Sequence, residues 1–197
     1  NRKKMLSLKE SLKILKETNA LIEGHFILSS GLYSPKYVQC AQLFSKPIHA
    51  LQICESLASK IKNEIDDFNL ILSPAMGGII VGYELGKILN KESIFYEGVN
   101  GEFKLRRDFQ IKKGDKVLIV EDVITTGKSS LECSRLVSEN KAIIVGYACI
   151  IDRSNGKSKI KEKIISQIEL DIPTYSKENL PKELITLKAV KPGSRNL

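Results

Sequence analysis

The sequence predicts an α/β fold in which a central, mostly parallel sheet is flanked by helices. Short runs of apolar, mainly β-branched residues recur at 70–72, 117–120 and 142–151, which suits strands buried on both faces. Between these runs, apolar residues recur at helical spacing. Strand, helix and strand at such separations indicate parallel pairs with right-handed crossovers. A length of 197 residues fits one domain, 1–197, with a sizeable core.

The first third of the chain predicts a helix, a pair of short strands and a second helix. Ser7 and Glu10 have the spacing of a capping box, which starts an amphipathic helix that ends before Gly24. Residues 24–40 alternate in polarity between Gly and Pro breaks, so short strands around a turn are expected. Apolar residues at helical spacing then mark the second helix, after Pro47: Ile48, Leu51, Ala58, Ile61 and Ile65.

The middle of the chain alternates strands and helices. Residues 70–72 predict a buried strand, 79–89 a mostly apolar helix and 93–96 another strand. The polar span 97–116 predicts a hairpin or a mobile loop. A helix is expected to continue through 131–137.

The last part of the chain carries weaker signals. The run at 142–151 is the longest strand-like segment, and 164–170 is also strand-like. We expect a turn at 171–175 and a basic tail at 191–195. Neither an internal repeat nor a linker between domains is visible in the sequence.

Charge and hydropathy limit the partners that the chain can have. There are 31 basic and 23 acidic residues, which gives a net charge of +8, but the lysines are scattered and indicate a solvated surface. No stretch interleaves clustered Lys and Arg with aromatic residues, so no nucleic-acid partner is expected. No apolar stretch approaches the roughly 18 residues that span a bilayer, and Asn1 opens a lysine-rich segment expected to be helical rather than a signal sequence. We therefore expect no membrane partner.

The four cysteines indicate a reducing compartment. Cys40, Cys54, Cys133 and Cys149 show no C-x-x-C spacing, and none has a metal-ligand spacing to a histidine. They are typical of reduced thiols, so a cytoplasmic location is expected.

Residues 117–130 carry the strongest functional signal. A strand at 117–120 ends at two exposed acids, Glu121 and Asp122, and a small-residue turn at 125–129 then opens a helix. Ligands of open α/β sheets bind beyond the carboxyl ends of the strands, where two acids can hold ribose hydroxyls directly or through a divalent cation. Backbone N–H groups at a helix start favour a phosphate. The order of these parts indicates a site for a sugar that carries phosphates.

Two structural alternatives and one functional alternative apply to this segment. The acids could belong to a solvated turn, and Thr-Thr-Gly at 125–127 could simply cap a helix. The fragment 127–129, Gly-Lys-Ser, is typical of a P-loop, but that motif requires glycine where this chain has Asp122. A nucleoside-triphosphatase site is therefore disfavoured.

A second loop, at 73–78, lies between a predicted strand and a predicted helix. Gly77 and Gly78 let the backbone approach a ligand at a helix start. The alternative is a tight turn whose glycines serve packing. Because residues 121–129 follow a later strand of the same sheet, the ligand-binding interpretation gains weight.

Residues 117–130 resemble the phosphoribosyl-diphosphate (PRPP) motif of the type I phosphoribosyltransferases. The resemblance implies the fold of that family, with a small N-terminal hood formed by residues 1–45, and implies PRPP binding by two groups. The first is Glu121, Asp122, Val123, Ile124, Thr125, Thr126, Gly127, Lys128 and Ser129. The second is the pyrophosphate loop with Ala75, Met76 and Gly77, where a non-proline cis peptide is expected between Ala75 and Met76.

Two further segments resemble the orotate phosphoribosyltransferase family. The first has matching positions at Phe26, Leu28, Ser30, Gly31, Ser34 and Tyr37. The second is the strand that ends in Asp152 and Arg153, whose arginine takes the orotate carboxylate in that family. The resemblance covers most of 20–155 and the terminal Lys-Pro-Gly-Ser-Arg. By itself, Arg153 could equally form a surface ion pair.

This resemblance implies the remaining site residues and partners. Orotate would contact Thr125, Arg153, Ser30 and Gly31, and the catalytic residues would be Asp122, Lys104, Arg106 and Arg107. Mg²⁺ would be the cofactor, bound through PRPP with Asp122 and Glu121 nearby. The family's mobile loop reaches a neighbouring subunit, which implies a homodimer with a shared active site.

The chain departs from the family at three places. Ser29 and Gly77 stand where many members carry lysine, and no histidine occurs in the basic segment 103–109. Two rival functions therefore remain: a phosphoribosyltransferase for another base, and a PRPP-fold regulator that binds nucleic acid. The carboxylate-binding role of Arg153 argues against the first, and the scattered charge argues against the second.

Overall fold

The structure, a computed structural model, describes residues 5–193. The beginning at Asn1 and the end of the expected basic tail, 194–195, lie outside the described residues. The strands are β1 (Leu21–Ile27), β2 (Tyr33–Val38), β3 (Leu70–Pro74), β4 (Glu92–Val99), β5 (Glu102–Leu105), β6 (Lys116–Ile124), β7 (Ile143–Asp152) and β8 (Ile164–Glu169). The helices are α1 (Leu8–Glu17), α2 (Cys40–Phe44), α3 (Pro47–Glu64), α4 (Gly77–Leu89), α5 (Lys128–Glu139), the short 3₁₀ helix Lys177–Asn179 and α6 (Lys182–Ile185).

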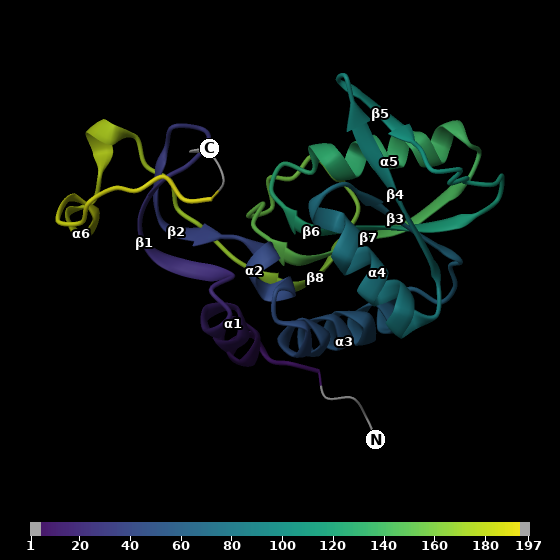
Figure 1. The fold of residues 1–197 in the computed structure, drawn as a ribbon, viewed down its shortest axis with the longest axis horizontal. Helices are drawn as coiled ribbons and strands as arrows, with labels where there is room; N and C mark the ends of the chain where they lie inside the picture. The colour runs from purple at the N-terminus through teal and green to yellow at the C-terminus, as the bar shows by residue number, and fades with distance from the viewer. Residues whose placement is uncertain (1–4, 194–197) are drawn as a thin grey trace.

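Six strands form the central sheet in the order β5-β4-β3-β6-β7-β8 (Figure 1). All neighbouring pairs are parallel except β4 and β5, which form an antiparallel hairpin. The predicted α/β class with a mostly parallel sheet is confirmed. From β3 the chain passes to β4 on one side and later to β6 on the other, so the strand order reverses between β3 and β6. Such a reversal leaves a crevice at the carboxyl ends of the two strands.

Helices cover both faces of this sheet. One core cluster joins α1, α3 and α4 to the sheet, and a second joins α5 to the opposite face (Figure 1). In α3 the buried stripe is Ile53, Leu57 and Ile61, which recur every four residues. Ile48 and Leu51, which helped to mark this helix in the sequence, lie on its exposed side. Periodicity thus located the helix, but not every apolar residue in it faces the core.

A two-stranded hairpin stands apart from the central sheet. β1 and β2 pair antiparallel (Figure 1). We call this hairpin the hood. Helix α1, which precedes β1, begins with the expected capping box, in which the side chains of Ser7 and Glu10 bond each other's backbone N–H groups. The hood lies at the same end of the molecule as α6 (Figure 1).

Two segments near the C-terminus, around Tyr175 and Val190, pair with the hood. The expectation of a turn at 171–175 was wrong: this segment is irregular and brings Tyr175 into an isolated bridge with Tyr33 on β2. Val190 bridges Phe26 on β1. A two-stranded hairpin is only marginally stable alone, and its edges carry unpaired backbone groups, so pairing at both edges stabilises it.

No helix within the part of the chain that the structure describes is long and apolar enough to cross a membrane.

Candidate active site at the carboxyl edge of the sheet

Glu121 and Asp122 lie within the part of strand β6 that pairs with its neighbour β7, and not beyond the end of the strand. The strand runs to Ile124, so the sequence placed its end four residues too early, and Glu121 pairs alongside Cys149 of β7. Both acids are half-buried, which corrects the expectation of exposed side chains. The longer strand accounts for this, because neighbouring strands and helices shield its side chains.

Burial and one hydroxyl group shift the pKa of Glu121 in opposite directions. Burial is the main reason that the pKa of Glu121 is raised to about 7, and the nearby Asp122 contributes to the rise. The hydroxyl of Ser130, in the first turn of α5, donates a 2.7 Å hydrogen bond to Oε2 of Glu121 and opposes the shift. Near neutral pH this carboxyl therefore lies close to its titration point, where a bound cation or ribose can change its charge.

Asp122 joins the two loops of the predicted site. Its Oδ1 accepts a 2.9 Å hydrogen bond from the N–H of Val123, and burial raises its pKa. A Cβ added to Gly77 would stand 2.7 Å from Oδ2 and 2.8 Å from Oδ1 of Asp122. The carboxylate therefore packs on the bare backbone of Gly77, and the loops after β3 and β6 meet.

The turn after β6 presents free backbone donors. Gly127 has a φ of +83°, and an added Cβ would stand 2.9 Å from the Oγ of Ser158, so glycine is required there. No side chain caps the start of α5, although the N–H of Lys128 lies 3.3 Å from Oγ1 of Thr126. The first-turn N–H groups and the helix dipole can therefore receive a phosphate.

The remaining members of this turn differ in exposure. Thr125 and Lys128 are exposed and Ser129 is half-buried. The side chain of Ile124 is buried and that of Val123 packs against the core, so at these two positions the backbone is the part open to a ligand.

The loop after β3 has the expected backbone. The peptide between Ala75 and Met76 is cis, which confirms the expectation, and the N–H of Ala75 donates to the carbonyl of Tyr96 over 2.9 Å. Helix α4 begins at Gly77 with no side-chain cap. Two uncapped helix starts thus lie beside the acid pair, that of α4 next to Asp122 and that of α5 next to Glu121.

Arg153 lies beside this edge of the sheet. Its backbone N–H donates to the carbonyl of Ile124 over 2.9 Å, and its side chain is half-buried. Burial lowers the pKa of the guanidinium, and Tyr37, close enough to interact with it, opposes that shift. No carboxylate of residues 5–193 forms an ion pair with Arg153, so the alternative of a surface ion pair is wrong for the described part of the chain. A half-buried cation without a partner is suited to an anionic ligand.

The basic loop, residues 103–109, is not assembled with the acids. Lys104 forms a 2.7 Å ion pair with Glu102. Arg107 is bound by Glu97 through two hydrogen bonds of 3.0 and 3.1 Å, and Arg106 is exposed. The structure therefore shows these cations paired on their own hairpin or exposed to solvent.

Ser30 and Gly31 lie on the hood. They form the exposed tip between β1 and β2, where Gly31 has a φ of +82° and donates its N–H to the carbonyl of Leu28. The hydroxyl of Ser30 likewise bonds within this tip, where it accepts from the N–H of Leu32.

Sequence reasoning missed two contributors to the site. Ser130 was part of the segment 117–130 but had no assigned role, although a hydroxyl in the first helical turn after an acid is a recognisable signal. The loop after β7 was missed entirely: the N–H of Lys159 donates to the carbonyl of Thr126 over 2.8 Å, and Ser158 packs on Gly127. No local sequence pattern predicts a contact between two segments that lie so far apart in the chain.

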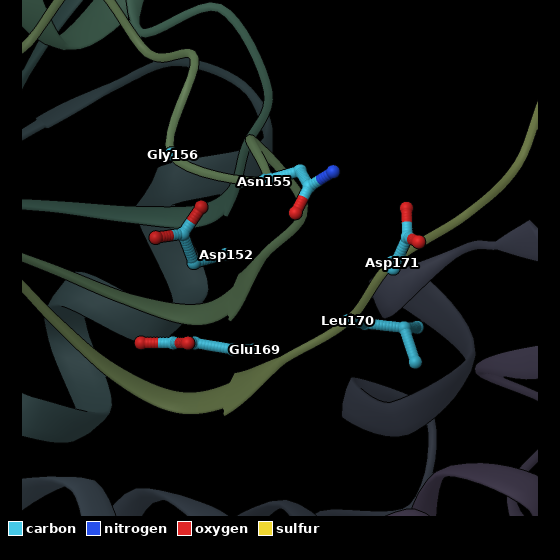
Figure 2. Close-up of a pocket in the computed structure, with 6 residues that line it drawn as sticks. All are labelled: Asp152, Asn155, Gly156, Glu169, Leu170 and Asp171. Carbon is cyan, nitrogen blue, oxygen red and sulfur yellow. The ribbon is translucent and has the colours of Figure 1, made fainter.

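A hollow of about 380 Å³ lies next to the site but has the wrong charge for phosphate. Figure 2 shows its lining at the ends of β7 and β8: Asp152, Asn155, Gly156, Glu169, Leu170 and Asp171. Asp152 and Glu169 are register partners on neighbouring strands. Three carboxylates repel an anion, so the crevice between β3 and β6 remains the candidate site.

Fold and crevice together define a phosphoribosyltransferase. The model of the phosphoribosyl transferase domain matches residues 42–178, well over half of the chain. The chain is 47% identical to an orotate phosphoribosyltransferase of Parvibaculum lavamentivorans over 189 residues, which cover 94% of this chain and 97% of the relative. It is 43% identical to the orotate phosphoribosyltransferase of Maricaulis maris, with 95% and 97% covered. The chain therefore belongs to the orotate phosphoribosyltransferase family.

Solved structures agree on the fold. The orotate phosphoribosyltransferase of Aeropyrum pernix matches with a TM-score of 0.69 at 23% identity, covering 80% of this chain and 92% of that chain. An adenine phosphoribosyltransferase of Thermoanaerobacter pseudethanolicus matches with a TM-score of 0.61 at 19% identity, covering 68% and 88%. The type I phosphoribosyltransferase fold is thus shared by enzymes for different bases, and the fold alone does not select the base.

Proposed function

We propose that this protein transfers the 5-phosphoribosyl group from PRPP to orotate, giving orotidine 5′-monophosphate and pyrophosphate, a step of de novo pyrimidine biosynthesis that leads to UMP. The observation that carries the choice of base is Arg153, a half-buried guanidinium without a carboxylate partner among the described residues, at the edge that holds the acid pair. The names of the curated relatives support the same choice.

The arrangement of the two loops supports PRPP as the donor. We assign the 5′-phosphate to the turn 125–129, the ribose hydroxyls to Asp122 and Glu121, and the pyrophosphate to Ala75, Met76 and Gly77. In PRPP the pyrophosphate is bonded to C1 of the ribose, so the two binding loops must be neighbours. The packing of Asp122 on Gly77 provides that adjacency.

The residues present fit a role for Mg²⁺ that depends on the substrate. Among the described residues no group of three His, Cys, Asp or Glu side chains could hold a metal ion. Asp122 and Glu121 nevertheless offer carboxylate oxygens, the ligands that Mg²⁺ prefers, and the phosphates of PRPP would supply the rest. When bound, the ion would neutralise charge on the departing pyrophosphate.

The chemistry is a displacement at the sugar. The bond from C1 to the pyrophosphate oxygen breaks, N1 of orotate forms the new bond to C1, and the N1 proton is released. No protein nucleophile is needed, so catalysis depends on holding donor and acceptor in place and neutralising the leaving charge. Arg107, Arg106 and Lys104 are the proposed cations for this. Arg107 has to leave Glu97 before it can act, so we propose that the basic loop moves when PRPP binds.

An exposed apolar stripe on α4 supports a homodimer. Met76, Ile80 and Tyr83 follow one another at helical spacing and are 85%, 52% and 64% exposed. The stripe begins in the pyrophosphate loop, so a second copy bound there would lie beside the active site. A basic loop acting on the partner's site, as the family implies, needs such a neighbour.

The proposal also includes the domain organisation, the role of the hood and the location in the cell. We propose that residues 1–197 act as one phosphoribosyltransferase domain, with the hood covering the base. The four cysteines are unpaired and buried, which suits a protein of the cytoplasm. We assign no nucleic-acid or membrane partner.

An assay of purified protein with PRPP, MgCl₂ and a panel of bases tests the function. Orotate should be consumed only when PRPP and the divalent cation are both present, which absorbance can follow. Equal or greater turnover of uracil, hypoxanthine or adenine would reject orotate as the acceptor and favour a transferase for another base. No turnover of any base, together with salt-sensitive binding of nucleic acid, would favour the regulator instead.

A further inference from the structure

Tyr96 of β4 contacts both phosphate-binding loops of the proposed donor site. Its backbone carbonyl accepts a 2.9 Å hydrogen bond from the N–H of Ala75, in the loop after β3. Its side-chain hydroxyl donates a 3.2 Å hydrogen bond to the carbonyl of Ser129, in the first turn of α5. One residue therefore binds the segment that we assign to the pyrophosphate and the segment that we assign to the 5′-phosphate.

The side chain of Tyr96 is fixed by its surroundings. It is 1% exposed and belongs to the core cluster that joins α5 to the sheet. Its ring meets that of Phe103, the first residue of the basic loop, edge to face, with centroids 5.1 Å apart and planes at 68°. A second acceptor for its hydroxyl, Oε2 of Glu132, lies 3.4 Å away, so the Ser129 carbonyl is the nearer of the two. Packing thus holds the ring, while the hydroxyl connects β4 to the start of α5.

The packing of this cluster does not by itself require a tyrosine. A phenylalanine would fill the same space without bringing a polar atom into the core, where a hydroxyl is unfavourable unless it is hydrogen-bonded. We propose that Tyr96 is a positioning residue for PRPP: its hydroxyl fixes the turn 125–129 at the distance from the pyrophosphate loop that the donor requires. This inference rests on the proposed function, because it assumes that these two segments bind the two ends of PRPP.

The covalent structure of the donor makes the spacing of the two loops important. The 5′-phosphate and the pyrophosphate of PRPP are joined to the same ribose, so the distance between them is limited. The Ser129 carbonyl belongs to the helical turn whose N–H groups can receive the 5′-phosphate. A shift of this turn moves those donors relative to Ala75, and a small error in their position weakens the binding of a ligand that spans both loops.

The test is Tyr96→Phe in the full-length protein, with the KM for PRPP and for orotate measured separately. This change removes the hydroxyl but keeps the ring beside Phe103 and the carbonyl that binds Ala75. The KM for PRPP should rise by about fivefold or more, while the KM for orotate and kcat stay within about twofold of the wild type. Tyr147→Phe is the matched control and should leave all three constants within about twofold. Tyr147 is a buried tyrosine of the same cluster, but it lies on β7, with β3 and β6 between it and β4.

Two fragments of the donor separate the two loops. Ribose 5-phosphate carries only the 5′-phosphate, and inorganic pyrophosphate carries only the leaving group. In titration calorimetry with MgCl₂ present, Tyr96→Phe should bind ribose 5-phosphate about fivefold more weakly than the wild type does. Its affinity for pyrophosphate should stay within about twofold, because the hydrogen bond from Ala75 to the backbone carbonyl is kept.

Three results would overturn the inference: an unchanged KM for PRPP in Tyr96→Phe, an equal rise of the KM for PRPP and for orotate, or an equal loss of affinity for ribose 5-phosphate and pyrophosphate. The second and third would show that the hydroxyl serves the stability of the core and not the position of one turn. Failure of the wild-type protein to use PRPP with orotate, or to bind either fragment, would instead reject the proposed function, so the two failures are distinguishable.

Discussion

The carboxylate of Asp122 at the end of β6 lies on the bare backbone of Gly77 at the start of α4, so close that a Cβ there would stand 2.7 Å from Oδ2. This contact exists because β3 and β6 are neighbours at the point where the strand order reverses. Any side chain at position 77 would need Asp122 to move.

The first prediction concerns this contact. Gly77→Ala should displace the Asp122 carboxylate and raise the KM for PRPP by about tenfold or more, because the ribose and pyrophosphate sites would lose their relative position. Steady-state kinetics at saturating orotate would measure the effect. Gly98→Ala is the control, since its Cβ would come no nearer than 3.4 Å to Phe103. Unchanged KM for PRPP in Gly77→Ala would remove the crevice from the donor site.

The second prediction separates function from stability at the acid pair. Glu121→Gln with Asp122→Asn should lower turnover by at least about 100-fold, because both charges that orient the ribose are lost. The melting temperature should stay the same or rise, because burial disfavours the charged form of both acids in the unliganded protein. Near-normal turnover would mean that 117–130 is not the donor site.

The third prediction concerns pH. The pKa of Glu121 is raised from 4.5 to about 7, so between these values the folded state binds a proton that the unfolded state has released. The contribution of Glu121 to the free energy of unfolding should therefore fall as the pH rises through this window, by roughly 1 to 3 kcal/mol. Urea denaturation of the wild type and Glu121→Gln, near pH 5 and pH 8, measures the difference.

Glu121→Gln should flatten this part of the pH dependence, while Glu92→Gln, a change at an exposed strand position, should leave it as in the wild type. An unaltered slope in Glu121→Gln would show that the carboxyl is not held in a desolvated environment.

The fourth prediction tests the choice of base. Arg153→Ala should raise the KM for orotate far more than that for PRPP, because loss of a charged hydrogen-bonding partner in a desolvated site costs about 2 kcal/mol or more. Arg153→Lys should rescue only in part, since a point charge does not reproduce the two-pronged guanidinium. Equal weakening of both substrates would make Arg153 a structural residue.

The fifth prediction tests the shared active site. Arg107→Ala and Asp122→Asn should each be nearly inactive, but a mixture of the two chains should recover part of the activity, because some hybrid dimers keep one intact site. Recovery should be followed after subunit exchange has been verified by differently tagged chains. A dimer that exchanges subunits but recovers nothing would place Arg107 and Asp122 in the same subunit's site.

Much of the local structure could be predicted because it depends on residue spacing. The capping box at Ser7 and Glu10 and the strand at 70–72 are confirmed, as is the cis peptide at Ala75 that the family resemblance implied. Predictions from the sequence were wrong where tertiary contacts override a local signal. β6 continues to Ile124 because β7 pairs alongside it, although the acids at 121 and 122 suggested a strand end. Residues 171–175 do not turn, because pairing with β2 straightens them.

The sequence by itself determined the α/β class, the acid pair, the two helix starts that can receive a phosphate and the arginine that can take a carboxylate. Each is written in a few consecutive residues whose chemistry and spacing act locally. Only the tertiary structure decided that Asp122 packs on Gly77, that Arg107 pairs with Glu97, and that Gly193 lies against Tyr37. These contacts depend on which strands become neighbours and where the chain end returns, and the physical reason is that such pairings are selected by burial over the whole fold and not by any short stretch of sequence.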